Sequence, residues 1–195
     1  MDGTDKRKRK PRQGIWRLVN FRWVITITVL SLLISMSLSY LSTEALANVG
    51  NLAAFLILFI FIALGILFDI IGVAATSATE KEFHSMAAKK VKGAKEAVWL
   101  TRNAEKVSSF CNDVVGDISG IISGATGAVI IARVTGGLGP APAVVVSLTV
   151  TGCIAAMTIG GKAAGKALGI GFNGTILFAV GRLLSILPFS FDKKK

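Results

Sequence analysis

Charged and chemically reactive side chains are scarce in this 195-residue sequence. Charged residues make up 17% of the chain, against about 25% in soluble domains, and the mean hydropathy is +0.66. This composition excludes an ordinary soluble enzyme. The two cysteines, Cys111 and Cys153, form no CxxC pair, and the single histidine, His84, has no catalytic partner pattern. We therefore expect no disulfide framework, no zinc site and no enzymatic activity.

Basic residues outnumber acidic ones, with 22 Lys and Arg against 11 Asp and Glu. Such an excess is compatible with nucleic-acid binding when the basic side chains line one surface. Here they gather instead in residues 1–22, in residues 79–106 and from Lys162 onward, around long uncharged runs. Basic clusters that flank apolar runs are typical of membrane proteins. No nucleic acid is therefore expected as a partner.

Four apolar runs are long enough to cross a bilayer, for which about 20 residues suffice in a helix. They cover residues 23–41, 51–77, 108–131 and 143–161. The first run follows basic residues, as a secretory signal does, but it is longer than the roughly 7 to 15 apolar residues of such a signal. We therefore expect an all-α, multi-pass transmembrane protein with four spans.

The positive-inside rule places the three basic segments on the cytoplasmic side of the cell membrane, together with both chain termini. The two loops on the opposite side contain Glu44 and no Lys or Arg. Residues 79–107 have apolar side chains at helical spacing with lysines between them, which predicts an amphipathic helix along the membrane. A second such helix is expected in residues 172–188, ended by Pro188. These basic segments would contact anionic lipid headgroups.

Glycine spacing indicates close packing between the spans. Small residues at every fourth position let two membrane helices approach closely. This spacing occurs twice, at Gly116, Gly120 and Gly124 and at Gly161, Gly165 and Gly169.

Three carboxylates lie within the predicted spans, where an ionised Asp costs about 2.5 to 3.5 kcal/mol at the helix centre. Asp69 lies near the end of the second span, and Asp113 and Asp117 lie near the start of the third. At 1.5 Å per residue, all three are roughly 8 to 14 Å from the same side of the membrane. Asp113 and Asp117 are spaced i, i+4 and share a helix face, with Asn112 on an adjoining edge.

These carboxylate and amide oxygens are the ligands of a hard cation such as Mg²⁺, Ca²⁺ or Mn²⁺. The residues therefore point first to cation coordination by Asp69, Asn112, Asp113 and Asp117. Two alternatives stay open: the acids could handle protons, or they could be neutral and pack through hydrogen bonds.

Around these acids the chain resembles the transmembrane domain of the CNNM/CorC magnesium transporter family. The run from Phe68 to Ser77 occupies the place of a polar stretch that ends the family's first core helix. The run from Arg102 to Asn112 is similar to the family's Asn-Pro-Glu-Arg run, and it leads to Ser109, a further candidate ligand. Lys162 stands at the position of a Pro-Lys pair that closes the last core span.

The resemblance implies a homodimer that binds Mg²⁺ through oxygens of the first two core helices and exchanges it for Na⁺. It covers residues 50–188, so residues 1–22 form an added basic arm, residues 23–49 an added span and loop, and residues 189–195 a tail. The family's CBS domains are absent from this sequence. The sequence also departs from the family pattern, since Asp69 replaces a serine and Gly161 a proline.

The expected function is therefore transport of a divalent cation, Mg²⁺ in the first place. The depth of the acids, near the cytoplasmic side, favours export. A second hypothesis is a membrane scaffold or ion sensor that does not transport and that binds anionic lipid or a partner through its basic loop.

Overall fold

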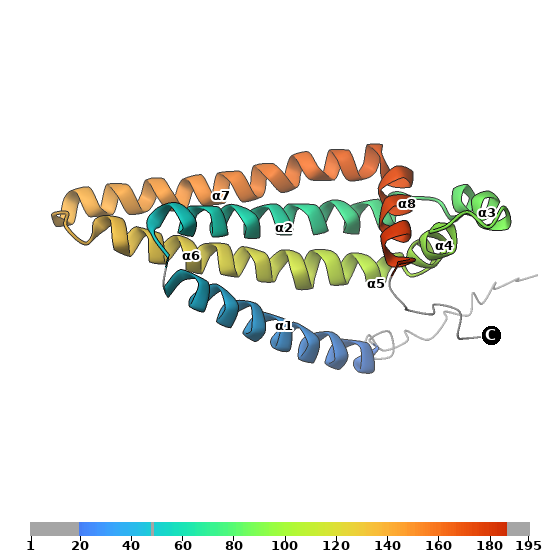
Figure 1. Cartoon of the computed structure of the whole chain (residues 1–195), viewed down its shortest axis with the longest axis horizontal. Helices are drawn as coiled ribbons and strands as arrows, with labels where there is room; N and C mark the ends of the chain where they lie inside the picture. Colours follow the sequence, from blue (N-terminus) through green and yellow to red (C-terminus); the bar gives the residue numbers. More distant parts are fainter. Residues whose placement is uncertain (1–19, 48, 187–195) are drawn as a thin grey trace, which may run out of the picture.

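The computed structural model describes residues 20–47 and 49–186, and every regular element in this part is a helix (Figure 1). Four helical stretches are long and apolar enough to cross a membrane: α1 (Phe21–Ala47), α2 (Asn51–Ser77), the continuous stretch Ala104–Thr135, and α7 (Pro140–Gly171). The prediction of an all-α, multi-pass protein with four spans is confirmed. Most of the basic arm, the tail and Pro188 lie outside the described residues.

The observed bounds of α2 agree with the predicted second span, but the other three spans are longer than predicted. The third is built from α5 (Ala104–Ser108), the π-helix η2 (Ser109–Gly116) and α6 (Asp117–Thr135). The fourth, α7, begins with Pro140 in its first turn, where the missing N–H of proline is tolerated. It continues ten residues beyond the predicted end at Gly161, to Gly171. The lengths of the apolar runs underestimate the lengths of these helices, because the helices continue beyond the apolar runs through polar residues.

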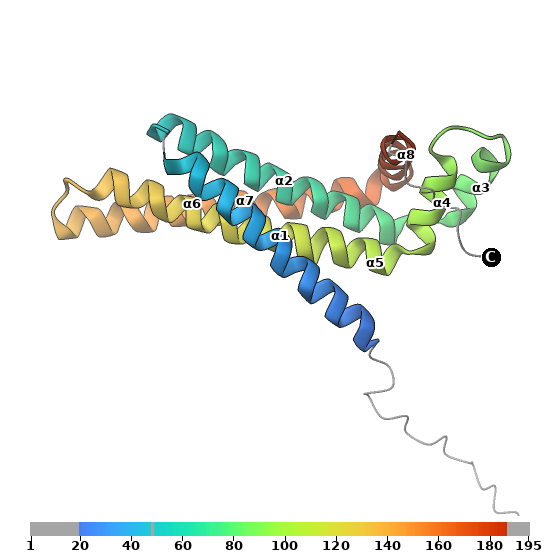
Figure 2. The same cartoon turned by 60° about the horizontal axis from the view of Figure 1, so that its bottom comes forward.

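Helix α2 packs against both α6 and α7, which also contact each other (Figures 1 and 2). The predicted glycine packing is present on α7, where a Cβ at Gly165 would lie 2.8 Å from Cγ1 of Ile70 and one at Gly169 would lie 2.9 Å from the Ile70 carbonyl oxygen. Of the three glycines predicted to pack on the third span, Gly116 is enclosed, whereas a Cβ at Gly120 or Gly124 would meet no atom within 4 Å. Of the two predicted glycine rows, the one that forms a close helix contact along its length is therefore the row on α7, which packs against α2.

Helix α1 packs against η2 and α6 and diverges from the rest of the bundle (Figure 2). Apolar side chains of α1 contact a buried row on the third span that consists of Val114, Ile118 and Ile122. The contact is made by Ile27, Ile34 and Leu38.

One end of the bundle carries α3 (Glu80–Ala88), α4 (Ala94–Arg102) and α8 (Asn173–Leu184), and we call it the basic end (Figure 1). Residues 79–107 were expected to form one amphipathic helix and instead form two helices before α5. The chain turns between them at Lys90 and Gly93, which have positive φ angles of 56° and 89°. Helix α8 confirms a short apolar helix after the last span, and its 12 residues are too few for a crossing.

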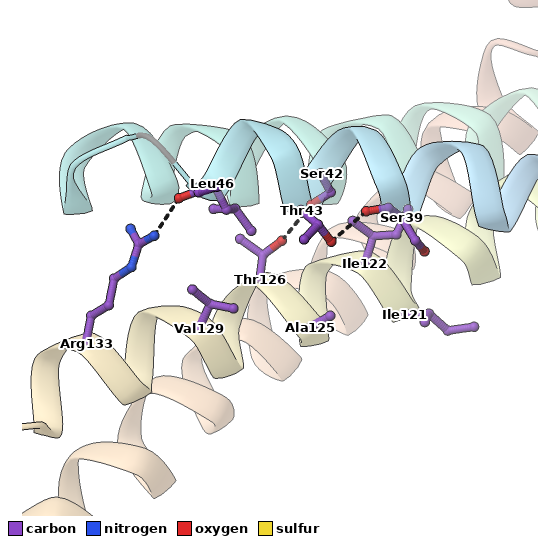
Figure 3. A pocket seen from close by; sticks show the side chains of 11 residues that line it. Ser39, Ser42, Thr43, Leu46, Ile121, Ile122, Ala125, Thr126, Val129 and Arg133 are labelled. Atoms are coloured by element: carbon purple, nitrogen blue, oxygen red, sulfur yellow. Dashed lines mark hydrogen bonds between the residues drawn. The ribbon is translucent and has the colours of Figure 1, made fainter.

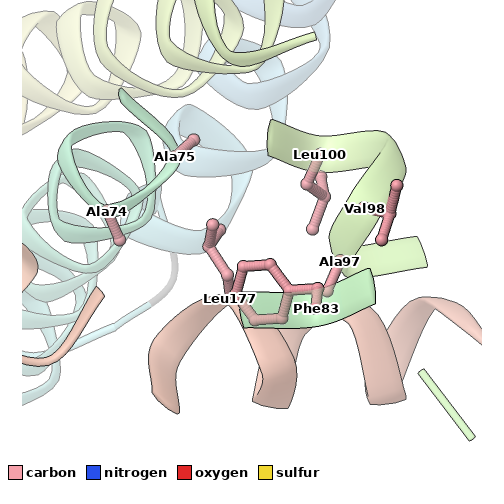
Figure 4. Packing of buried hydrophobic residues seen from close by; sticks show 7 residues of the cluster. All are labelled: Ala74, Ala75, Phe83, Ala97, Val98, Leu100 and Leu177. Atoms are coloured by element: carbon pink, nitrogen blue, oxygen red, sulfur yellow. The ribbon is translucent and has the colours of Figure 1, made fainter. Parts of the chain in front are cut away.

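A compact apolar cluster joins α3, α4 and α8 to the end of α2 (Figure 4). Phe83 of α3 and Leu177 of α8 are almost completely buried at its centre. Gly93 and Gly181 let α4 and α8 approach closely, since a Cβ at either glycine would overlap the other helix. The cluster fixes the basic end against α2, on which Asp69 lies about one and a half turns before Ala74 and Ala75. Its members are Ala74, Ala75, Phe83, Ala97, Val98, Leu100 and Leu177.

Candidate ion site in the membrane helices

Asp69 is buried in the contact between α2 and the third span, with only 4% of its surface exposed. Gly65 and Gly72 are buried on the same face of α2. A Cβ at Gly65 would lie 3.1 Å from the Cβ of Ser119, and a Cβ at Gly72 would overlap the Asn112 amide. The two glycines thus let the third span approach α2 closely above and below Asp69, which encloses its carboxylate.

The segment that faces Asp69 is the π-helix η2, which covers residues Ser109–Gly116. A π-helix closes hydrogen bonds from residue i to residue i+5, is rare, and occurs frequently at functional sites. Asn112 lies in its middle and donates a hydrogen bond from Nδ2 to Ser108 Oγ over 3.2 Å. That bond orients the amide so that Oδ1 lies against α2 at Gly72.

Three polar atoms in this contact are buried and have no hydrogen-bond partner among the described residues: Asp69 Oδ2, Asn112 Oδ1 and Ser119 Oγ. An unsatisfied buried polar group costs about 1 to 3 kcal/mol, and more when it is charged. Native interiors contain few such groups. A cation coordinated by these oxygens, or an ordered water hydrogen-bonded to them, would remove that cost.

The other two acids do not share this enclosed position. Asp113 and Asp117 are exposed in the monomer, and Asp113 Oδ2 accepts a hydrogen bond from Ser109 Oγ over 2.8 Å. Within residues 20–47 and 49–186, no three His, Cys, Asp or Glu side chains are grouped so that they could hold a metal ion. The structure therefore brings Asp69 and Asn112 to one contact but leaves Ser109, Asp113 and Asp117 outside it. The three aspartates therefore do not surround a single ion in this conformation.

A charged side chain, Lys162, lies near the candidate site. From the sequence, this lysine was expected just beyond the end of the last span. It is half-buried within α7, and a Cβ at Gly116 would lie 3.4 Å from its Nζ. The contacts of Gly161 and Gly165 with Ile66 and Ile70 place Lys162 level with Asp69 along α2. No ion pair joins Lys162 to a carboxylate in the described part of the chain. The repeated glycines after residue 160 are the sequence signal that the helix continues past Lys162.

Comparisons of the chain with protein-family models, with curated proteins and with solved structures found no match.

Proposed function

We propose that this protein transports Mg²⁺ across a membrane and that Asp69 and Asn112 form the core of its ion site. The observation that carries the proposal is the pair of buried oxygens, Asp69 Oδ2 and Asn112 Oδ1, which lack hydrogen-bond partners in the described helices. Both lie in the contact between α2 and η2. Ionisable residues inside the membrane are costly and are retained mainly for function.

The available ligands suit Mg²⁺ better than softer or larger ions. Asp69, Asn112 and Ser119 offer only oxygen atoms, which favours a hard cation over zinc or copper. Mg²⁺ keeps several of its waters and is usually bound through one or two carboxylates, whereas Ca²⁺ takes about six to eight oxygen ligands. A contact with one enclosed carboxylate therefore fits a partly hydrated Mg²⁺. The resemblance to the CNNM/CorC family points to the same ion.

Asp113, Asp117 and Ser109 keep their predicted role as ligands only if η2 turns toward α2 in another conformation. In the described conformation the exposed carboxylates would be costly against lipid. We propose that a second copy of the chain covers this face in a homodimer, or that the face opens to water during transport. Either arrangement would let these acids attract a cation toward Asp69.

The proposed orientation follows from the charge distribution. The basic end of the bundle is proposed to face the cytoplasm, since Lys and Arg gather on that side in multi-pass proteins. Asp69 lies eight residues before the end of α2 at this side, which is about 12 Å at 1.5 Å per residue. This depth favours loading from the cytoplasm and hence export. The resemblance to the CNNM/CorC family suggests Na⁺ as the exchange ion.

Calorimetric titration of Mg²⁺ into the purified protein tests the site. Asp69→Asn keeps the side-chain size, removes the buried charge and should reduce the affinity by at least about tenfold, which corresponds to roughly 1.4 kcal/mol. Asp113→Asn should cause a smaller loss, because that carboxylate lies outside the enclosed contact. Glu44→Gln, at the other end of the bundle, is the matched control and should bind like the wild type. Equal affinity in wild type and Asp69→Asn would refute the assignment.

The alternative function, a scaffold or ion sensor, is favoured by the exposed basic surface around the turn between α3 and α4. Its lysines are exposed and suit anionic headgroups. Binding to anionic vesicles that survives Asp69→Asn, without any Mg²⁺ transport, would support this function. The surface consists of Lys89, Lys90, Lys92 and Lys95.

A further inference from the structure

A cavity of ≈ 260 Å³ separates α1 from α6 toward the end of the bundle opposite the basic end (Figure 3). Helix α1 crosses α6 at an angle (Figure 2), so that the two helices do not close against each other along their whole length. In a membrane this cavity would face the lipid, since no other described element covers it. It is independent of the Asp69 contact, which lies between α2 and η2.

The walls of the cavity present mainly apolar surface, although several of the side chains carry hydroxyl groups. Thr43 Oγ1 donates to the Ser39 carbonyl oxygen over 2.8 Å, and Ser42 Oγ pairs with Thr126 Oγ1 at 3.4 Å. These three hydroxyls therefore have partners within the protein. Ala125 on the α6 wall is small and leaves the space open (Figure 3).

Arg133 lies at the outer rim of the cavity (Figure 3). Its Nη1 donates to the Val49 carbonyl oxygen over 3.0 Å and its Nη2 donates to that of Leu46. A guanidinium has five N–H donors, so these two bonds leave donors for an external acceptor. Among the described residues at this end of the bundle, Arg133 is the only Lys or Arg. Arginine pairs with phosphate through directed, charge-assisted hydrogen bonds.

The cavity runs along α6 from Arg133 at the rim to Ile121 at its inner end. These residues are 12 positions apart, or about 18 Å at 1.5 Å per residue. A positive rim at the end of the helix and an apolar interior toward its middle have the polarity of a lipid in a bilayer, with headgroup outward and acyl chain inward. The opening between α1 and α6 allows entry sideways from the membrane.

We propose that this groove binds an anionic phospholipid, with one acyl chain between α1 and α6 and the phosphate on Arg133. In a membrane the chain leaves other lipid tails rather than water, so selectivity rests on the contact of the headgroup with Arg133. The lipid fills the space that α1 leaves and holds α1 against the bundle.

Native mass spectrometry of the detergent-solubilised protein, with phosphatidylglycerol or phosphatidylcholine added, tests the proposal. The wild type should retain one phosphatidylglycerol molecule and about tenfold less phosphatidylcholine. Ala125→Trp fills the groove and should lose the bound lipid. Ala128→Trp is the matched control, because Ala128 is exposed on α6 outside the cavity and should leave retention unchanged.

Arg133 also donates a hydrogen bond to the end of α1, so its positive charge and its structural role must be tested separately. The variants Arg133→Gln and Arg133→Lys do this, because only the second keeps the charge. Arg133→Gln should abolish the preference for phosphatidylglycerol, and Arg133→Lys should retain most of it. Size-exclusion chromatography checks that each variant is folded; if Ala125→Trp is not, Val129→Trp fills the same groove. Equal retention of phosphatidylglycerol by the wild type and a folded groove-filling variant would overturn the proposal, as would a wild type that retains no lipid.

Discussion

The side chain of Asn112 occupies the space that a side chain at residue 72 would need. A Cβ built on Gly72 would overlap Asn112 Oδ1. The absence of a side chain at Gly72 is therefore what allows the amide oxygen of η2 to lie against α2, next to the buried Asp69.

Gly72→Ala is expected to displace Asn112 and weaken the site. Overpacking of a close contact typically costs about 1 to 3 kcal/mol, and the displaced amide would also lose its place as a ligand. The variant should therefore unfold at lower temperature and bind Mg²⁺ several-fold more weakly, as measured by thermal unfolding with and without the ion. Gly120→Ala is the control, because a Cβ there meets nothing within 4 Å. Identical Mg²⁺ stabilisation in Gly72→Ala and wild type would contradict the placement of Asn112.

Lys162→Gln is expected to tighten Mg²⁺ binding by about tenfold, since a nearby ammonium group repels a divalent cation. Lys166, one turn further along α7, is exposed and provides the matched control Lys166→Gln. Calorimetry on the two variants measures the difference. Weaker binding in Lys162→Gln would show instead that the ammonium stabilises the site.

The orientation predicts that the last turn of α1, which contains Glu44, lies outside and that the turn between α3 and α4 lies inside. In a background without Cys111 and Cys153, a cysteine at Glu44 should react with an impermeant thiol reagent added to intact cells. A cysteine at Lys92 should react only after the cells are opened. The reverse labelling pattern would show that the protein has the opposite orientation in the membrane, and it would contradict export.

Glu80 links α3 to α4 and predicts a pH-dependent contact at the basic end. Its carboxylate accepts hydrogen bonds from Arg102 Nε and from His84 Nε2, the latter over 2.8 Å. The bond from Arg102 is the main reason that the pKa of Glu80 lies below its ordinary value of 4.5. Because the folded-state pKa is lowered, the contact stabilises fully above pH 4.5 and is lost as the pH falls through the folded-state value.

Hydrogen exchange of α3 and α4 measures this contact. Exchange should accelerate below pH 4.5, after correction for the intrinsic rate, and Glu80→Gln should show the faster exchange already at neutral pH. Because Glu80 is only partly buried, the effect should be local. An unchanged exchange rate in Glu80→Gln would refute the role of this carboxylate.

The membrane fold could be predicted from the sequence because uncharged apolar runs of about 20 residues are typical of transmembrane helices. The bounds of α2 agree with the predicted second span, and Asp69 is enclosed as a costly intramembrane acid should be. The helix of the fourth span continues beyond Gly161, where the prediction ended the span, because apolar length takes no account of packing. Contacts of Gly165 and Gly169 with α2 keep α7 helical past Lys162.

Two further features could not be predicted from local patterns. The residues of η2 carry no sequence signal that separates a π-helix from an α-helix, so the inward position of Asn112 and the outward position of Asp113 follow from packing on α2. The break between α3 and α4 depends on the positive φ of Lys90 as well as on Gly93. Glycine predicts such a turn, but lysine does not.

Mg²⁺ flux into liposomes that contain the purified protein is the most direct test of the proposed function. An indicator enclosed in the liposomes should report Mg²⁺ entry with the wild type under an opposing Na⁺ gradient, and no entry above empty liposomes with Asp69→Asn. Glu44→Gln should transport like the wild type. If the wild type passes no divalent cation under any Na⁺ or H⁺ gradient, or if Asp69→Asn transports equally well, the assignment of this protein as a Mg²⁺ transporter acting through Asp69 is contradicted.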